Sequence, residues 1–253
     1  MSALKAKLSR GETVLGQMVL EFFTPGIALM MDRCGLEFCI YDMEHGRCDI
    51  SLAAQMIASC HGTAVAPIVR VPDLNTAPLS RMLDMGAKGV MVPRVETGAQ
   101  MRDIVAQLKY APAGRRGVAL GITHDRFRAA DASYFARAND ETVVIALCET
   151  VRAFDNLDDI LSTPGLDVAW MGHYDLTVSM GIPAQFDHPQ FLEFMGRLAD
   201  RCRHFGIAAG FLPATPGETV RWIQRGFRAI SLGSDIGVYV NALNQFRQAA
   251  FLA

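Results

Sequence analysis

The sequence predicts an α/β fold in which eight parallel strands close into a (β/α)8 barrel. Eight short apolar runs recur along the 253 residues, and segments with the period of an amphipathic helix separate them. Most of the short runs are apolar on both alternations, as parallel strands covered on both faces are. One barrel commonly takes about 250 residues, so residues 1–253 are expected to form a single domain.

The apolar runs give the predicted strands in chain order. They are Val14–Leu20, Phe38–Tyr41, Ala64–Val69, Gly89–Val92, Val143–Leu147, Val168–Met171, Ile207–Phe211 and Arg228–Leu232. The predicted helices include Pro25–Arg33, Ser51–Ser59, Pro78–Met85, Ala99–Leu108, Asn156–Leu161, Gln190–Arg203, Glu218–Arg225 and Ile236–Phe251. Because eight strand–helix repeats follow one another, closure into a barrel is favoured over an open sheet.

Residues that start or end helices fall at the junctions between these elements. Asp49 is suited to cap the helix after it, and Thr215-Pro216 puts a proline near a first helical turn. Five glycines each follow a helical segment and precede a strand, where a C′ glycine belongs. These are Gly35, Gly62, Gly86, Gly206 and Gly226. Residues 1–12 are expected to form a short amphipathic helix.

The composition argues against several classes of function. The formal net charge is −2, and there is no clustered basic excess of the kind that binds nucleic acid. Six cysteines without a Cys-x-x-Cys pair indicate buried or reduced thiols in a cytoplasmic protein rather than a disulfide framework. The N-terminus lacks the apolar region of a signal peptide. Without a run of about 18 apolar residues, no membrane helix is expected.

Two carboxylates follow neighbouring predicted strands. Glu149 comes directly after the fifth strand, and Asp175 comes shortly after the sixth. The active site of such a barrel forms at the C-terminal strand ends. Mg²⁺ and Mn²⁺ bind one or two protein carboxylates and keep several waters, so this pair is a candidate metal site. The alternative is that both carboxylates pair with arginines or cap helices.

A histidine and an arginine follow the second and third strands. His45 is flanked by Asp42 and Glu44, and a carboxylate beside a histidine can fix its tautomer and raise its basicity. Arg70 ends an apolar strand, where its charge would be costly unless it met an anion at the barrel mouth. The alternatives are a structural role for His45 and a salt bridge between Arg70 and Asp42, which would also orient the arginine.

The segment Gly172–Asp175 is the candidate seat for a substrate carboxylate. Its backbone N–H groups lie at a predicted helix N-terminus, which suits an anion, and Tyr174 belongs to this segment. Leu212 follows the seventh strand and is expected at the same mouth. The long segment Ala111–Ser133 has no clear period and is a candidate active-site loop, from which His124 is expected to line the pocket.

Several segments together resemble the HpcH/HpaI family of class II, metal-dependent pyruvate aldolases. The resemblance runs from about Leu15 to Phe246 in the family's order and spacing. It is carried by Asp42-Met-Glu-His45-Gly, Arg70-Val-Pro, the stretch from Leu83 to Thr97, Gly114-Arg-Arg-Gly117, Glu149-Thr150 and Gly172-x-x-Asp175-Leu-Thr-x-Ser-Met-Gly181.

The resemblance implies a TIM barrel of the phosphoenolpyruvate/pyruvate-binding type. It also implies hexamers with an exchanged C-terminal helix and sites completed across a subunit contact. Glu149 and Asp175 match the metal ligands, for Mg²⁺, Mn²⁺ or Co²⁺. Arg70 matches the arginine on the pyruvate keto oxygen, and the backbone at Tyr174-Asp175 matches the seat of the pyruvate carboxylate. His45 matches the acid/base histidine, and its supporting carboxylates are expected to be Asp42 and Asp84.

The chain departs from the family pattern around this centre. Leu147 stands where many members have Gln, and Gly172-His173-Tyr174 replaces Gly-Pro-Ala or Gly-Pro-Asn. The loop from Gly121 to Phe127 also differs from the commonest form. The physiological aldehyde is therefore not transferred from any member.

The function expected from the resemblance is reversible cleavage of a 4-hydroxy-2-oxo acid to pyruvate, or hydroxypyruvate, and an aldehyde. A Schiff-base lysine is not expected, because Lys88 precedes the fourth strand and therefore belongs to the opposite barrel face. One rival is a lyase acting on a CoA thioester or on oxaloacetate. Another is a non-catalytic barrel that binds a small acid.

Overall fold

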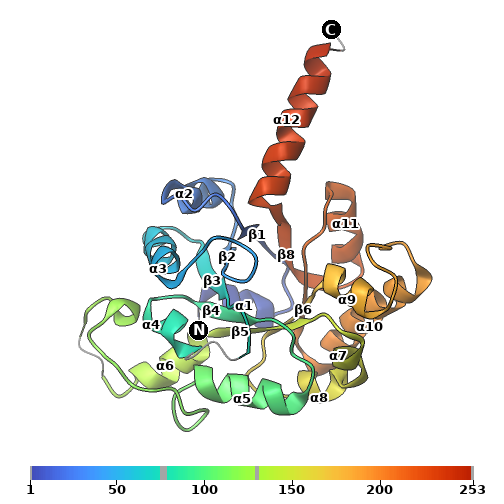
Figure 1. Cartoon of the computed structure of the whole chain (residues 1–253). Coiled ribbons are helices and arrows are strands. Elements are labelled where there is room, and N and C mark those ends of the chain that lie inside the picture. The colour runs from blue at the N-terminus through green and yellow to red at the C-terminus, as the bar shows by residue number, and fades with distance from the viewer. Residues whose placement is uncertain (1, 75–78, 129–130, 252–253) are drawn as a thin grey trace.

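The computed structural model describes residues 2–74, 79–128 and 131–251. Within them, eight parallel strands form a closed barrel in sequence order, and helices surround it (Figure 1), so the predicted fold is confirmed. The strands are β1 (Val14–Val19), β2 (Phe38–Asp42), β3 (Ala66–Arg70), β4 (Gly89–Val92), β5 (Val143–Cys148), β6 (Val168–Met171), β7 (Ala208–Phe211) and β8 (Phe227–Ser234). Each predicted strand is present.

One helix precedes the first strand, and the others lie between the strands and after the last one (Figure 1). They are α1 (Ala3–Ser9), α2 (Gly26–Arg33), α3 (Ile50–Ser59), α4 (Ser80–Asp84), α5 (Gly98–Leu108), α6 (Tyr134–Glu141), α7 (Val151–Asp155), α8 (Leu157–Leu161), α9 (His173–Ser179), α10 (Pro189–Phe205), α11 (Pro216–Gln224) and α12 (Asp235–Phe251), with a 3₁₀ turn, η1, at Thr123–Asp125. The expected helix from Pro78 begins at Ser80, and Pro78 itself lies outside the described residues.

The junction residues act as expected. Asp49 caps α3 by accepting the Leu52 N–H at 2.8 Å, and Pro216 opens α11 behind its Thr215 cap. The five junction glycines all have positive φ, which glycine adopts without steric cost. Helix α6 was not expected. None of its residues is buried, although the Tyr134 and Phe135 rings contact that of Tyr110.

The core has an inner and an outer part. Side chains that alternate along the strands, such as Phe38, Ile68, Leu147 and Trp170, fill the barrel interior. The opposite alternation packs against the surrounding helices. The filled interior means that substrates can be received only at the two ends of the barrel, where the loops gather.

The last helix, α12, leaves the barrel after β8 and projects away from it (Figure 1). Among its described side chains only Asp235 is buried. None of the described helices has both the length and the apolar stretch needed to cross a bilayer.

Candidate active site at the C-terminal end of the barrel

The last residues of β2 and β3 form a buried ion pair. Asp42 and Arg70 are register partners in the parallel ladder. Arg70 donates from Nε and Nη2 to the two Asp42 carboxylate oxygens, at 2.7 and 2.6 Å. This bidentate geometry fixes the guanidinium plane. Asp42 is fully buried, so the salt bridge weighed from the sequence is present and orients Arg70.

Glu44 supplies a second carboxylate to Arg70. Its Oε2 lies 3.2 Å from Arg70 Nη1. In the described part of the chain this buried oxygen makes no well-aligned hydrogen bond. Burial raises the pKa of Glu44, and the positive charge of Arg70 opposes the rise. A buried carboxylate oxygen without a hydrogen bond is available to accept one from a further group. The sequence had given Glu44 no role beyond flanking His45.

His45 lies at the open edge of this group, with 55% of its side chain exposed. The Asp42 carboxylate accepts the backbone N–H of His45 at 3.3 Å. The carboxylate recorded nearest the imidazole is that of Glu44, with Oε2 3.8 Å from Nε2. The expectation that Asp42 supports the His45 ring is therefore corrected. Asp42 turns the loop and holds Arg70, and Glu44 faces the ring.

Glu149 lies just beyond the end of β5 and is only 3% exposed. Its Oε1 accepts the backbone N–H of Arg94 at 2.7 Å. Burial raises the pKa of Glu149 to about 8. The Arg94 hydrogen bond opposes this rise, and the charges of Asp175 and Glu44 add to it. The Glu149 carboxylate thus has a hydrogen bond from the main chain on one oxygen and the negative charges of Asp175 and Glu44 acting on it.

Gly172 makes room for the Glu149 carboxylate. Cys148 and Met171 are register partners, so the next residues, Glu149 and Gly172, emerge side by side. A Cβ at position 172 would lie 2.5 Å from Glu149 Cβ and would overlap its Oε2. Sequence reasoning assigned Gly172 to a substrate carboxylate, and the structure gives it this further, steric reason.

Asp175 stands in the first turn of α9, whose N-cap is Gly172. It is exposed, whereas Glu149 is buried. Tyr174 beside it is 61% exposed and its ring contacts Phe186. His173 packs between Phe186 and Phe211, and burial lowers its pKa to about 4, which keeps the imidazole neutral at ordinary pH.

Leu212 and Leu147 complete the wall below these groups. Leu212 follows β7 and packs on the inner core of the barrel, as a residue at the mouth should. Leu147 is buried in that same core, two residues before Glu149 on the same side of β5. The floor beneath the carboxylates is therefore apolar.

The donor set at this mouth fits a hard divalent cation. The described residues contain no group of three or more His, Cys, Asp and Glu side chains arranged to hold a metal ion. Two carboxylates with water completing the shell is, however, how Mg²⁺ and Mn²⁺ are commonly held. A cation beside Glu149 would relieve its raised pKa and keep it ionised. The space that Gly172 leaves for the Glu149 carboxylate supports the same assignment.

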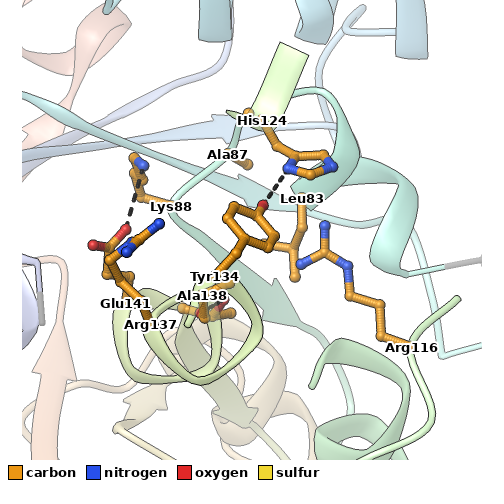
Figure 2. Close-up of a pocket in the computed structure, with 11 residues that line it drawn as sticks. Leu83, Ala87, Lys88, Arg116, His124, Tyr134, Arg137, Ala138 and Glu141 are labelled. Carbon is orange, nitrogen blue, oxygen red and sulfur yellow. Dashed lines mark hydrogen bonds and ion pairs between the residues drawn. The ribbon is translucent and has the colours of Figure 1, made fainter. Parts of the chain in front are cut away.

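Two residues expected at the site lie elsewhere within the chain. Asp84 ends α4 and forms an ion pair with Arg116, Oδ1 to Nη2 at 2.6 Å. His124 bonds the Tyr134 hydroxyl and lines a cavity with Lys88 and Glu141 (Figure 2).

Both residues belong to the N-terminal end of the barrel. Lys88 and Thr142, which also line the His124 cavity, directly precede β4 and β5. Glu149 follows β5 and lies at the opposite end. Within a single chain, therefore, neither Asp84 nor His124 joins Glu149 and Arg70. Asp84 is at this end because it ends α4, shortly before β4 begins, and His124 is there because the segment after α5 stays near the strand starts instead of folding over the mouth.

Comparison with known proteins gives a consistent family. The family model HpcH/HpaI aldolase/citrate lyase matches residues 22–242. A 2-keto-3-deoxy-L-rhamnonate aldolase from Klebsiella pneumoniae is 31% identical, over 95% of this chain and 90% of the relative. A 5-keto-4-deoxy-D-glucarate aldolase from Shigella boydii is 30% identical, over 84% of this chain and 82% of the relative.

Solved structures agree with the sequence relatives. The HpcH/HpaI aldolase from Desulfitobacterium hafniense superposes with a TM-score of 0.92 at 29% identity, covering 99% of this chain and 97% of that one. A citrate synthase, SbnG, superposes with a TM-score of 0.87 at 26% identity, covering 100% of this chain and 98% of that one.

Proposed function

The chain belongs to the HpcH/HpaI aldolase/citrate lyase family, and from that premise we propose how its own residues carry out an aldolase reaction. The protein is an enzyme, a carbon–carbon lyase of the class II aldolase type. The proposed reaction is the reversible cleavage of a 4-hydroxy-2-oxo acid to pyruvate, or hydroxypyruvate, and an aldehyde. The observation that carries this proposal is that Glu149, Asp175 in the first turn of α9 and the Asp42-bound Arg70 all follow or end barrel strands at their C-terminal ends.

Glu149 and Asp175 would hold a divalent metal ion, Mg²⁺, Mn²⁺ or Co²⁺. The ion would supply Lewis acidity toward the substrate's keto oxygen, where negative charge develops as the carbon–carbon bond breaks. The raised pKa of Glu149 and the space at Gly172 support the assignment of these two ligands.

Arg70 is proposed to bind the same keto oxygen. Its Nε and Nη2 are committed to Asp42, and its Nη1 lies toward Glu44. The guanidinium is thus held rigidly before substrate arrives. A donor fixed in advance stabilises developing charge without reorganisation. The substrate carboxylate would accept the N–H groups at the start of α9, around Tyr174 and Asp175, and Leu212 would line the pocket.

His45 is proposed to take the proton from the C4 hydroxyl during cleavage and to return it during addition. Its exposed ring is accessible to substrate, as a general base must be. Glu44 is proposed as its positioning residue, because the Glu44 carboxylate lies between the ring and Arg70. Asp42 contributes by holding the loop and Arg70.

The substrate class follows from the relatives. The name 2-keto-3-deoxy-L-rhamnonate aldolase describes an acid with a keto group at C2 and no hydroxyl at C3. We extend that pattern to this chain and leave the acceptor aldehyde to experiment. An aldehyde panel assayed with pyruvate and with hydroxypyruvate would identify it.

The same panel separates the rivals. The likeness to the citrate synthase SbnG favours oxaloacetate as a second candidate substrate, so decarboxylation of oxaloacetate and cleavage of CoA thioesters are assayed alongside. Turnover of a hydroxy-oxo acid well above both supports the aldolase. Calorimetric binding of pyruvate and metal without any turnover would instead indicate a non-catalytic binding barrel.

Assembly into a homohexamer with exchanged C-terminal helices is proposed as well. The exposed apolar side chains of α12, among them Leu243 and Phe246, support it, because such a surface on a helix that is not packed in its own chain calls for a partner. In that assembly Asp84 and His124 would reach the mouth of a neighbouring subunit. The six free thiols support a cytoplasmic location.

A further inference from the structure

Two buried thiols outside the active site lie side by side. Cys39 is in the middle of β2 and Cys60 caps the C-terminal end of α3. Their Sγ atoms are 3.9 Å apart. All six cysteines fall within the described residues, and among them this is the pair recorded at hydrogen-bonding distance. One thiol of a strand is thus in contact with one thiol at the end of the helix that follows that strand.

A tyrosine hydroxyl completes this group. Tyr41 lies two residues after Cys39 on the same face of β2, and its hydroxyl is 3.4 Å from Cys60 Sγ. The Cys39 thiol and the Tyr41 hydroxyl are therefore both within hydrogen-bonding distance of the Cys60 sulfur, and the Cys60 thiol can give its own proton to the Met56 carbonyl oxygen at 3.6 Å, which leaves the other two groups to donate to Cys60. Donors aimed at a sulfur stabilise its thiolate, which is the reactive form of cysteine.

The pKa values of the two thiols are shifted in opposite directions, as expected from these hydrogen bonds. Burial raises the pKa of Cys39 well above its ordinary value. The hydrogen bond from Cys39 lowers the pKa of Cys60, although burial opposes it, and Tyr41 acts in the same direction. Cys60 is therefore the nucleophile of the pair, and Cys39 keeps its proton.

Cys60 also has a route to small molecules. It lines a cavity of about 180 Å³ at the N-terminal end of the barrel, together with His61, Gly62 and Lys88. One water occupies about 30 Å³ in the liquid, so the cavity admits an oxidant as small as hydrogen peroxide. Cys39 is fully buried behind Cys60.

We propose that Cys39 and Cys60 form a peroxide-responsive thiol pair that closes into an intramolecular disulfide. The Cys60 thiolate attacks one oxygen of hydrogen peroxide, the O–O bond breaks, and the hydroxide that leaves is protonated to water. Cys60 is then a sulfenic acid. Cys39 attacks that sulfur, the S–O bond breaks, an S–S bond forms and a second water leaves.

Atoms and electrons balance in this reaction, and the two sulfur atoms start close together. Two thiols lose two protons and two electrons, and one peroxide becomes two waters. Closure brings the sulfur atoms from 3.9 Å to the roughly 2.05 Å of an S–S bond. The proposal concerns the chain itself and does not depend on the reaction at the other end of the barrel.

The test uses the folded wild-type protein. It is treated with hydrogen peroxide, alkylated in denaturant with N-ethylmaleimide, and digested with trypsin and chymotrypsin. Chymotryptic cleavage at Phe38 separates Cys34 from Cys39, and cleavage at Leu52 separates Cys48 from Cys60. The expected product is a Cys39–Cys60 cross-linked peptide that dithiothreitol releases.

Variants assign the roles within the pair. Cys60→Ser should abolish the cross-link, and Tyr41→Phe should slow its formation several-fold. Cys34→Ser, at the exposed thiol, is the matched control and should leave the yield unchanged. Full alkylation of Cys39 and Cys60 after peroxide, or a disulfide that contains Cys34 instead, would overturn the proposal. Because the wild type carries the primary readout, a variant that fails to fold does not decide the matter.

Discussion

Arg70 combines two demands that compete in a protein interior. Its side chain has to be buried because it lies at the bottom of the active-site opening. A buried charge, however, is stable only when it is paired with an opposite charge. The bidentate bond to Asp42 meets the second demand. Burial tends to lower the pKa of Arg70, but Asp42 and Glu44 raise it above its ordinary value, so the guanidinium stays charged. Function and folding therefore depend on the same pair.

Replacing Arg70 should separate these two contributions. Arg70→Ala removes a charge donor from the keto oxygen, and kcat/KM should fall by about 10²–10³-fold. It also leaves Asp42 buried without its partner, which should lower the free energy of unfolding by about 3–5 kcal/mol, measured by urea denaturation.

The double variant Asp42→Asn/Arg70→Ala is the control for folding. Removing both charges should restore most of the stability and none of the activity. An Arg70→Ala enzyme that is folded and has wild-type kcat/KM would remove Arg70 from the mechanism.

Gly172 offers a test of the metal ligands that leaves both carboxylates in the chain. In Gly172→Ala the new Cβ must displace the Glu149 side chain. Affinity for Mn²⁺, measured by isothermal titration calorimetry, should fall by about 10–100-fold, as for other changes that misorient a ligand. Gly196→Ala is the matched control, because a Cβ there meets nothing within 4 Å. Equal Mn²⁺ affinity in the two variants would contradict the assignment.

The residue identities at the mouth could be predicted from the sequence because each follows a recognisable strand. Of the contacts between them, the Arg70–Asp42 salt bridge could be anticipated as one alternative, whereas the contacts of Glu44 could not. The loop after β2 turns back so that the Asp42 carboxylate accepts the N–H groups of Glu44 and His45. That turn directs Glu44 toward Arg70. Its geometry depends on the tertiary position of Asp42, which no local pattern in the sequence records.

At the scale of elements, burial on both faces made the strands predictable to within about two residues. The helices were predictable where one face is apolar and the ends carry caps. The segment after α5 was not, since its side chains are mostly exposed and its path is set by a few long-range contacts. One of these is the Lys109 ammonium.

Lys109 joins the end of α5 to the end of α6. Its Nζ donates to the carbonyl oxygens of Asn139 at 2.5 Å and Thr142 at 2.9 Å. The Lys5 ammonium donates to the same Thr142 oxygen. Burial, followed by the charge of Lys5, lowers the pKa of Lys109 to about 7.

This lowered pKa predicts how stability changes with pH. Between about pH 7 and the ordinary lysine value near 10.5, the unfolded chain binds a proton at Lys109 that the folded chain does not. Stability must therefore rise with pH across that window, by up to about 1.4 kcal/mol per pH unit for one proton, and Lys109 adds no slope below it.

The difference in free energy of unfolding between wild type and Lys109→Met, measured by urea denaturation from pH 6 to pH 10, isolates this contribution. Titrating groups that do not interact with Lys109 contribute equally to both proteins and cancel. Above pH 7 the free energy of unfolding of the wild type should increase relative to that of the variant. Parallel pH profiles would show that Lys109 does not titrate in this range.

At the scale of the whole molecule, one chain provides the mouth but leaves Asp84 and His124 at its other end. The assembly proposed above, through the projecting α12 (Figure 1), would resolve this separation. The periodicity of the sequence predicts α12 but not the surface that its apolar side chains contact. The same pattern is expected whether a helix packs on its own barrel or on another chain.

Charged substitutions on α12 should reduce the assembly. Leu243→Asp and Phe246→Asp place carboxylates on side chains that are 51% and 77% exposed in the single chain and that assembly would bury. The molar mass from size-exclusion chromatography with light scattering should fall below that of the wild type. Asn244→Asp on the same helix is the control and should leave the mass unchanged. A wild type that is already monomeric would contradict the proposed assembly.

The central claim is that Glu149 and Asp175 hold a metal ion on which pyruvate-forming cleavage depends. The most direct measurement is pyruvate release from the 4-hydroxy-2-oxo acid that the aldehyde panel identifies, coupled to lactate dehydrogenase, after the enzyme has been stripped with EDTA and passed through a desalting column. Activity should be lost, should return with Mn²⁺, Co²⁺ or Mg²⁺, and should not return in Glu149→Gln. Full activity in the stripped enzyme, together with trapping of pyruvate on a lysine by borohydride, would contradict the account.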